Sequence, residues 1–269
     1  MAAAPYFVSL HHEIRLEENL PAIGAWDGAA LRLLQNARGV LMPKYFSPPR
    51  YRYAASLAQA HFPRLDTRYA YRGKAAQIHL FRRLGVPHPR SFIYASPQEA
   101  LEARSSGSLP LAYPFVLKGD RGGGGSAVFP VADRAALEAG LGRLPPEEPV
   151  LLQEWVENPG RDLRVVLMGP LTRSYFRLGG ESFYNNVSKG ARIDSGLLPE
   201  QQRQGREMAR QIARAASIDL AAFDIMFPRH GPPLTIEINF LFGTKGLGGS
   251  RGYSGLFRQA VQEWMESLS

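Results

Sequence analysis

Three side chains with oxygen ligands, Asp224, Glu237 and Asn239, lie on two short runs in which apolar and polar residues alternate. Such alternation is typical of half-buried strands, and the turn-forming residues 228–233 between the runs predict a hairpin. If the turn centres in the middle of that segment, Asp224 lies directly opposite Glu237, and Asn239 shares the face of Glu237. Opposed residues have Cβ atoms about 4.5–5.5 Å apart, and two carboxylates that close repel unless a cation joins them. The pattern therefore favours a site for a hard cation such as Mg²⁺ over a solvated polar strand face.

A glycine-rich loop follows the predicted strand 113–118, which ends in Lys118, and leads into a second predicted strand at 127–129. Glycines allow backbone N–H groups to approach phosphate oxygens without obstruction by side chains. The loop is not a Walker loop, because Lys118 precedes the glycines and no Gly-Lys-Ser/Thr follows, and no helix starts there as in a Rossmann turn. We predict a flap that covers phosphates, with a flexible hairpin as the alternative. Its candidate residues are Gly122, Gly123, Gly124, Gly125 and Ser126.

Lys74 stands at the start of a predicted helix over 73–85, where the helix dipole opposes a cation. The lysine is therefore a candidate for contact with an anion, and a solvated lysine is the alternative. Further along, the apolar strand predicted at 150–156 carries Trp155, which suits either a flat heterocycle or core packing. These two segments add a second cation and an aromatic surface to the candidate site.

Four more polar side chains lie between the glycine loop and the hairpin. Asp162 and Arg164 alternate on one predicted strand and so share a face. Asn186 and Lys189 belong to a polar segment, residues 183–192, that has few apolar residues with which to join a core. Amide, ammonium and guanidinium groups together suit anionic oxygens.

Composition restricts the class of protein. The chain has 269 residues, 45% of them hydrophobic, which is ordinary for a folded protein with one large or two modest domains. It has no cysteine, which excludes disulfides, thiolate metal sites and cysteine nucleophiles. No apolar run is long enough to span a membrane and the start lacks signal-peptide features, so we expect a cytoplasmic protein with no membrane partner. The net charge of +8 favours anionic partners, but nucleic-acid binding would rest on charge alone.

The order of these motifs resembles the ATP-grasp superfamily, in particular the branch that contains the ribosomal-protein glutamate ligases and glutathione synthetase-like proteins. The resemblance covers about residues 70–250 and implies an α+β fold in which two subdomains clasp ATP. A short α/β domain over residues 1–67 precedes the ATP-grasp domain over 68–269. Within the latter, the resemblance implies a flap subdomain at about 109–157 and a metal-binding core at about 158–269.

The resemblance also implies a role for each candidate residue. Lys74 and Lys118 match the lysines that hold ATP phosphates, and Gly122 to Ser126 match the flap. Arg164, Asn186 and Lys189 match residues that face the transferred phosphate. The remaining assignments are Glu154, Trp155 and Val156 to an adenine-binding hinge, Asp162 to a ribose contact, and Asp224, Glu237 and Asn239 to metal ligands, with Glu237 bridging two Mg²⁺ or Mn²⁺ ions.

The implied function is that of an ATP-dependent carboxylate–amine ligase that forms an amide through an acyl phosphate. Its partners would be ATP, a carboxylate and an amine, each of the last two an amino acid, a peptide or a protein tail. Two departures keep other functions open: Tyr184 stands where this branch often has arginine, and residues 240–249 replace a shorter family segment. An ATP-dependent phosphotransferase and a non-catalytic nucleotide- or peptide-binding module are the alternatives. The sequence leaves open whether the chain forms homo-oligomers.

Overall fold

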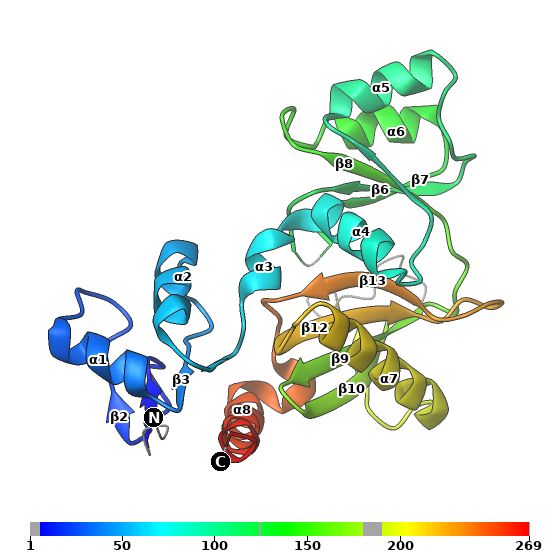
Figure 1. Ribbon diagram of the computed structural model, residues 1–269. Helices are drawn as coiled ribbons and strands as arrows, with labels where there is room; N and C mark the ends of the chain where they lie inside the picture. Colours follow the sequence, from blue (N-terminus) through cyan, green and yellow to red (C-terminus); the bar gives the residue numbers. More distant parts are fainter. Residues whose placement is uncertain (1–5, 124, 180–189, 269) are drawn as a thin grey trace.

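The computed structural model describes residues 6–123, 125–179 and 190–268, which form an amino-terminal domain, a small subdomain and a core (Figure 1). The amino-terminal domain is built on a parallel sheet in the order β2-β1-β3-β4. Its central strands are buried along their whole length, as is usual for parallel sheets covered on both faces. The elements are β1 (Phe7–Ser9), β2 (Glu18–Asn19), α1 (Gly28–Asn36), β3 (Gly39–Leu41), α2 (Pro48–Leu57) and β4 (His61–Phe62).

The small subdomain has an antiparallel sheet in the order β5-β8-β6-β7, with α5 and α6 packed over one apolar cluster. Ser96 and Asp133 cap these two helices through their side chains. Because β5 pairs with β8 along its whole length, the subdomain begins at Ser91, earlier than the predicted start at about 109. The elements are β5 (Ser91–Tyr94), α5 (Pro97–Ser105), β6 (Phe115–Gly119), β7 (Val128–Val131), α6 (Arg134–Leu141) and β8 (Val150–Glu154).

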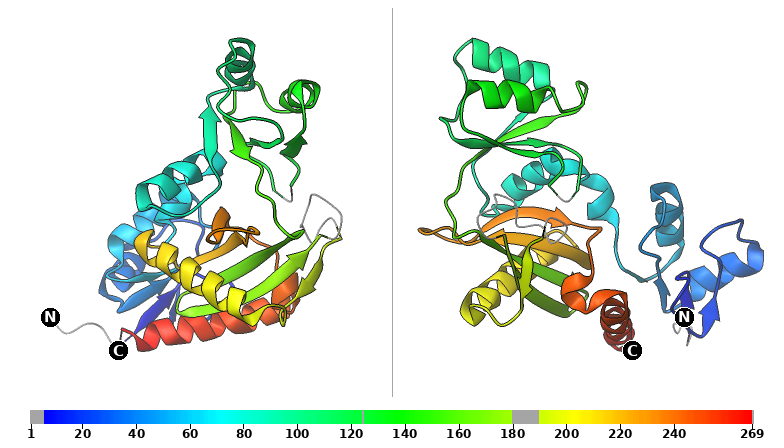
Figure 2. Two further views of the ribbon diagram at one scale, coloured as in Figure 1. Left: turned by 90° about the vertical axis from the view of Figure 1, so that its right-hand side faces the viewer. Right: turned by 180° about the vertical axis from the view of Figure 1, so that it is seen from behind.

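The core is an antiparallel sheet in the order β11-β10-β9-β12-β13. Helix α7 and the connecting helix α4 pack on one face, and α8 packs on the other (Figure 2). Helix α3 (Asp66–Ala70) and α4 (Gly73–Leu84) lead into the small subdomain. The core elements are β9 (Arg161–Met168), β10 (Leu171–Leu178), β11 (Arg192–Asp194), α7 (Pro199–Ala215), β12 (Leu220–Met226), β13 (Leu234–Asn239), the short 3₁₀ helix η2 (Lys245–Leu247) and α8 (Gly249–Glu266).

The hairpin predicted from the sequence is confirmed at Asp224 and Glu237, but its register shifts by one residue between Asp224 and Ile225, on the side of the turn. Strands β12 and β13 are antiparallel, and Asp224 pairs with Glu237. The last helix, α8, begins at Gly249. Gly248 and Gly249 have φ of 84° and 73°, a left-handed backbone that glycine adopts readily, so they turn the chain directly into the helix.

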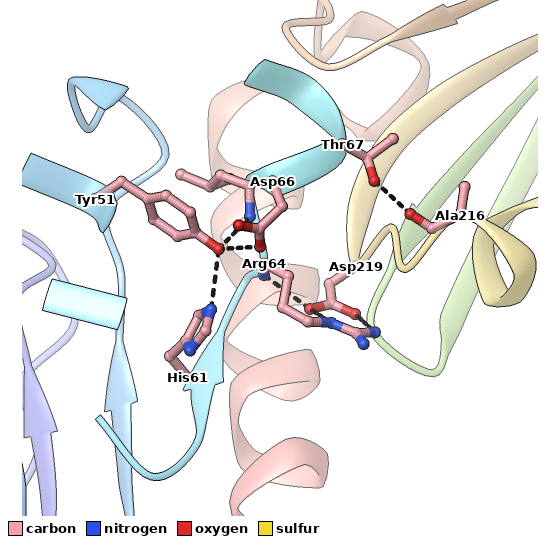
Figure 3. A network of polar contacts seen from close by, with 8 residues as sticks. Tyr51, His61, Arg64, Asp66, Thr67, Ala216 and Asp219 are labelled. Carbon is pink, nitrogen blue, oxygen red and sulfur yellow. Dashed lines mark hydrogen bonds and ion pairs between the residues drawn. The ribbon is translucent and has the colours of Figure 1, made fainter. Parts of the chain in front are cut away.

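A polar network ties the amino-terminal domain to the core (Figure 3). The Arg64 guanidinium donates to both oxygens of Asp219, at 2.9 and 2.6 Å, and the Thr67 hydroxyl donates to the Ala216 carbonyl. On the amino-terminal side, the Tyr51 hydroxyl donates to Asp66 at 2.5 Å. An apolar cluster shared between the two parts reinforces this junction. No helix in the described part of the chain is long and apolar enough to cross a membrane.

Candidate active site

A polar face of the core sheet carries the predicted metal ligands. Asp224 lies on β12, and its neighbours across the sheet are Arg164 on β9 and Glu237 on β13. The period of two along a strand sends Phe223 and Ile225 to the opposite face, where both are fully buried in an apolar cluster. The local sequence pattern thus places charge on one side of the sheet and core on the other.

Two arginines hold the Asp224 carboxylate. Arg164 binds it in a bidentate manner, with Nε and Nη2 each 2.8 Å from a carboxylate oxygen. Oδ2 also accepts from Arg177 Nη2 and from Asn239 Nδ2, both at 3.1 Å. Burial alone would raise the pKa of Asp224, but the two guanidinium groups outweigh it and hold that pKa at about 2. Asp224 is therefore ionised at neutral pH.

Arg177, on β10, is a site residue that the sequence reasoning missed. Its side chain is only 5% exposed, and its Nε lies 2.6 Å from Asp162 Oδ1 on the paired strand β9. Burial raises the pKa of Asp162 to about 6, although Arg177 lowers it. Asp162 is thus held in a buried ion pair through Oδ1, and its role as a ribose contact stays a prediction. The available signal was an arginine in register with Asp162 in a strand that mixes polar and apolar residues.

Glu237 and Asn239 supply the oxygens that a hard cation prefers. No hydrogen bond or ion pair joins the Glu237 carboxylate to another described residue, and burial raises its pKa. Because Asp224 accepts from the Asn239 amide nitrogen, the amide oxygen of Asn239 remains available. Across residues 6–123, 125–179 and 190–268 no three His, Cys, Asp or Glu side chains cluster, so the Asn239 oxygen is needed as the third ligand. This all-oxygen set fits Mg²⁺ or Mn²⁺.

Lys118 and its partner Gln153 lie on adjacent strands of the small subdomain. The buried Lys118 ammonium donates to Gln153 Oε1 at 2.6 Å, and Gln153 in turn donates to the Ser91 hydroxyl at 2.8 Å. Burial lowers the pKa of Lys118 to about 8, while the charge of Glu237 acts in the opposite direction. The charges of the Lys118 ammonium and the Glu237 carboxylate therefore interact across the two sheets.

The glycine loop packs against the start of α4. Asp120 accepts from the backbone N–H of Ala75 at 2.8 Å, and its own carbonyl accepts from the N–H of Lys74 at 3.1 Å. The Lys74 ammonium donates to the Gly122 carbonyl at 3.3 Å. Gly122 has a φ of 114°, a backbone conformation that favours glycine. Lys74 and the loop thus occupy one region; Gly124 lies outside the described residues.

The predicted adenine hinge follows β8. The Glu154 carboxylate accepts from the backbone N–H of Arg90 at 2.7 Å, and the backbone N–H of Glu154 donates to the Arg90 carbonyl at 2.8 Å, so both groups of Glu154 hold the strand in place. Trp155 is 42% exposed, which excludes the core-packing alternative for its ring. Val156 is half-buried at the point where the chain leaves the small subdomain for the core. Asn186 and Lys189 lie outside the described residues.

A family model matches the part of the chain that carries the two lysines, the glycine loop and the acidic hairpin. Residues 71–253, more than half of the chain, match the model of the RimK-like ATP-grasp domain. The chain belongs to this ATP-grasp family. The α+β ATP-grasp fold predicted from the sequence is therefore confirmed.

Relatives in this family include several enzymes with glutamate in their names. The chain is 31% identical over 158 residues to β-citrylglutamate synthase B of Danio rerio, covering 58% of this chain and 38% of that one. It is 28% identical over 186 residues to the ribosomal protein bS6–L-glutamate ligase of Escherichia fergusonii, covering 67% and 59%. The chain thus spans less than two thirds of the length of either relative.

Solved ATP-grasp structures share the fold. The RimK domain ATP-grasp protein of Sphaerobacter thermophilus has a TM-score of 0.60 at 18% identity, covering 94% of this chain and 98% of that one. The carboxyaminoimidazole ribonucleotide synthase of Aspergillus clavatus complexed with ATP has a TM-score of 0.56 at 16% identity, covering 80% and 56%. At these identities the structures support the ATP-grasp architecture alone.

Proposed function

We propose that this protein is an ATP-dependent carboxylate–amine ligase. The observation that carries the proposal is the polar face of the core sheet, where Asp224, Glu237 and Asn239 present oxygens close to Lys118. In the proposed reaction a substrate carboxylate oxygen attacks the γ-phosphorus of ATP, the bond to the β–γ bridging oxygen breaks, and ADP leaves. An amine then attacks the acyl carbon, phosphate leaves, and the amine loses a proton as the amide forms.

Positioning and charge account for the catalysis we propose, since no covalent nucleophile is needed. Lys74, Lys118 and Arg164 would neutralise the phosphate charge, and the glycine loop would keep water from the acyl phosphate. Glu237, the Asn239 amide oxygen and Asp224 Oδ1 would hold the divalent ions. These ions, Mg²⁺ or Mn²⁺, would supply electrostatic stabilisation of the transferred phosphoryl group.

Arg177 would act as a positioning residue in this mechanism. It occupies Asp224 Oδ2 together with Arg164 and Asn239, so the lone pair that remains for an ion is on Oδ1, where only Arg164 Nε binds. The two arginines thereby fix both the charge and the direction of this carboxylate. Asp162 holds Arg177 in place from the neighbouring strand.

The substrates we propose are an acidic compound, peptide or protein tail and an amino acid that provides the amine. The names of the relatives describe a glutamate ligase, a citrylglutamate synthase and an N-acetylaspartylglutamate synthase. Glutamate is therefore the first amine to test. Mass spectrometry of products formed from Mg-ATP and a pool of amino acids and peptides would identify the pair.

The Glu237→Gln variant tests the proposed site. We expect Mg²⁺-dependent release of ADP, with the carboxylate and amine identified above, to fall at least 100-fold, because an uncharged amide replaces the carboxylate proposed to bridge the ions. Glu157→Gln is the matched control, since Glu157 is exposed and pairs only with Arg229. Full turnover by Glu237→Gln would refute the metal assignment.

Isotope transfer tests the reaction class. A substrate carboxylate labelled with oxygen-18 should transfer one label to inorganic phosphate, because the acyl phosphate is cleaved between carbon and that oxygen. Turnover without label in phosphate would indicate a phosphotransferase instead. Tight ATP binding with no product from any acceptor would indicate a binding module.

A further inference from the structure

A cluster of cations and aromatic rings lies where the amino-terminal domain meets the segment after Asn239. The Lys44 ammonium is 4.6 Å from the centre of the Phe242 ring, 4.9 Å from that of Tyr253 and 5.7 Å from that of Tyr45. Two of these rings are held firmly, since Tyr253 meets Phe242 edge-on and stacks on the buried ring of Phe257. The aromatic surroundings of the lysine are therefore already formed.

Lys44 has no acidic partner among the described residues, although it is half-buried. Burial lowers the pKa of Lys44, and the nearby positive charge of Arg68 lowers it further. Aromatic faces offset only part of the cost of burying an ammonium, about 0.5–2 kcal/mol. Lys44 therefore lacks the counter-ion that a buried cation usually has.

Positive charge continues from Lys44 towards the proposed phosphate site. Arg68, on α3, donates to the Lys44 carbonyl, and its charge interacts with that of Arg72. Arg72 immediately precedes Gly73 and Lys74, the start of α4. Three cations, Lys44, Arg68 and Arg72, thus precede Lys74 in this part of the chain.

The cluster lies close enough to the proposed metal site for one small substrate to contact both. Phe242 follows Asn239 by three residues, so their Cα atoms are at most about 11 Å apart. A few residues on, Gly246 packs so closely on Tyr175 that a Cβ there would lie 2.1 Å from the ring. Tyr175 in turn lies opposite Arg164 on the paired strands β10 and β9. The segment 240–247 thus lies between Lys44 and the polar face of the core sheet.

We propose that Lys44 and Arg68 bind a carboxylate of the substrate, and that the exposed ring of Tyr45 contacts an apolar or aromatic group beside it. Tyr45 is 72% exposed, so its face is open to a ligand. The ligand class is an acidic amino acid derivative or peptide whose bound carboxylate is remote from the reacting group. This inference rests on the proposed function, since it assigns part of the substrate site of the same enzyme.

Calorimetry on the full chain with saturating Mg-ADP tests the inference. The probes are N-acetylphenylalanine, its amide, and N-acetylglycine. We expect the amide to bind at least tenfold more weakly than the acid, because it lacks the charge that pairs with Lys44, and N-acetylglycine to bind more weakly because it lacks the ring. Lys44→Gln should lose at least tenfold in affinity for the acid, and Lys44→Arg should retain most of it.

Two controls separate this inference from others. Arg143→Gln removes a cation that lies over Phe129 in the small subdomain, 5.8 Å from the ring centre, and should leave probe binding unchanged. Lys44→Gln should bind Mg-ADP as tightly as the wild type, which shows that it is folded. No binding of the acid to the wild type, equal affinity for acid and amide, or unchanged affinity in Lys44→Gln would overturn the inference. If the wild type does not bind Mg-ADP, the result would instead count against the proposed function.

Discussion

Replacement of Arg177 by methionine tests the buried charge network under the proposed site. Arg177 is 5% exposed and bridges Asp162, itself 14% exposed, to Asp224. Removal of one partner from a buried ion pair costs about 3–5 kcal/mol, because the other charge remains buried without compensation. Asp224 keeps the bidentate contact with Arg164, so the loss concerns mainly Asp162. We therefore expect Arg177→Met to lower the free energy of unfolding by about 3 kcal/mol at pH 8.

The effect should depend on pH in a defined direction. Burial already raises the pKa of Asp162 to about 6, above the value of about 3.9 in an unfolded chain, and loss of Arg177 removes a charge that lowers it. The folded variant would then hold a proton that the unfolded chain releases, so its stability falls as pH rises. The difference from the wild type should thus be larger at pH 8 than at pH 5.

Urea denaturation at both pH values measures this difference, and Asp162→Asn completes a double-mutant cycle. We expect the double variant, Arg177→Met with Asp162→Asn, to be at least about 1 kcal/mol more stable than the sum of the single effects predicts. The reason is that the double variant no longer buries the Asp162 carboxylate without a partner. Arg203→Met is the control, since Arg203 pairs with Glu200 on the exposed surface of α7 and its replacement should leave stability almost unchanged. A loss below about 1 kcal/mol for Arg177→Met, or an equal loss at both pH values, would refute the reasoning.

Three further predictions follow from single contacts. Gly246→Ala should lower the free energy of unfolding by about 1–3 kcal/mol and reduce turnover, because the new Cβ would lie 2.1 Å from the buried Tyr175 ring. In the same denaturation and activity assays Gly243→Ala should change neither quantity, because a Cβ there would meet nothing within 4 Å. Asp120→Ala and Asp133→Ala should each lower the free energy of unfolding by about 1 kcal/mol, because each removes a carboxylate that accepts from an N–H in the first turn of a helix. Of these two variants, only Asp120→Ala should raise the KM for ATP, since Asp120 lies beside Lys74. Burial lowers the pKa of His11 to about 4, so below pH 6.5 the folded state binds fewer protons than the unfolded state. The free energy of unfolding should therefore fall by about 1–3 kcal/mol as the pH decreases from 6.5 to 4. In urea titrations, His11→Asn should reduce this dependence on pH.

Local sequence determined the elements of this protein whose interactions are short in range. The hairpin of β12 and β13 has the predicted pairing of Asp224 with Glu237, because the turn and the alternation act on neighbouring residues, although a register shift follows at Ile225. The caps at Ser96 and Asp133 follow for the same reason, since each side chain bonds to an N–H three residues away. The order of motifs along the chain was sufficient to indicate the family, which the family model then confirmed.

Tertiary structure decided which distant residues share the site. Strand β9 lies between β10 and β12, and this order alone brings Arg177 to both Asp162 and Asp224. No local pattern specifies such a neighbour, because pairing between distant strands is selected by burial of their apolar faces and compensation of their charges. Lys44 likewise meets Phe242 only because the two domains pack together. The sequence alone determined the chemistry of the predicted ligands, while the fold decided how their charges are paired and where a substrate can approach them.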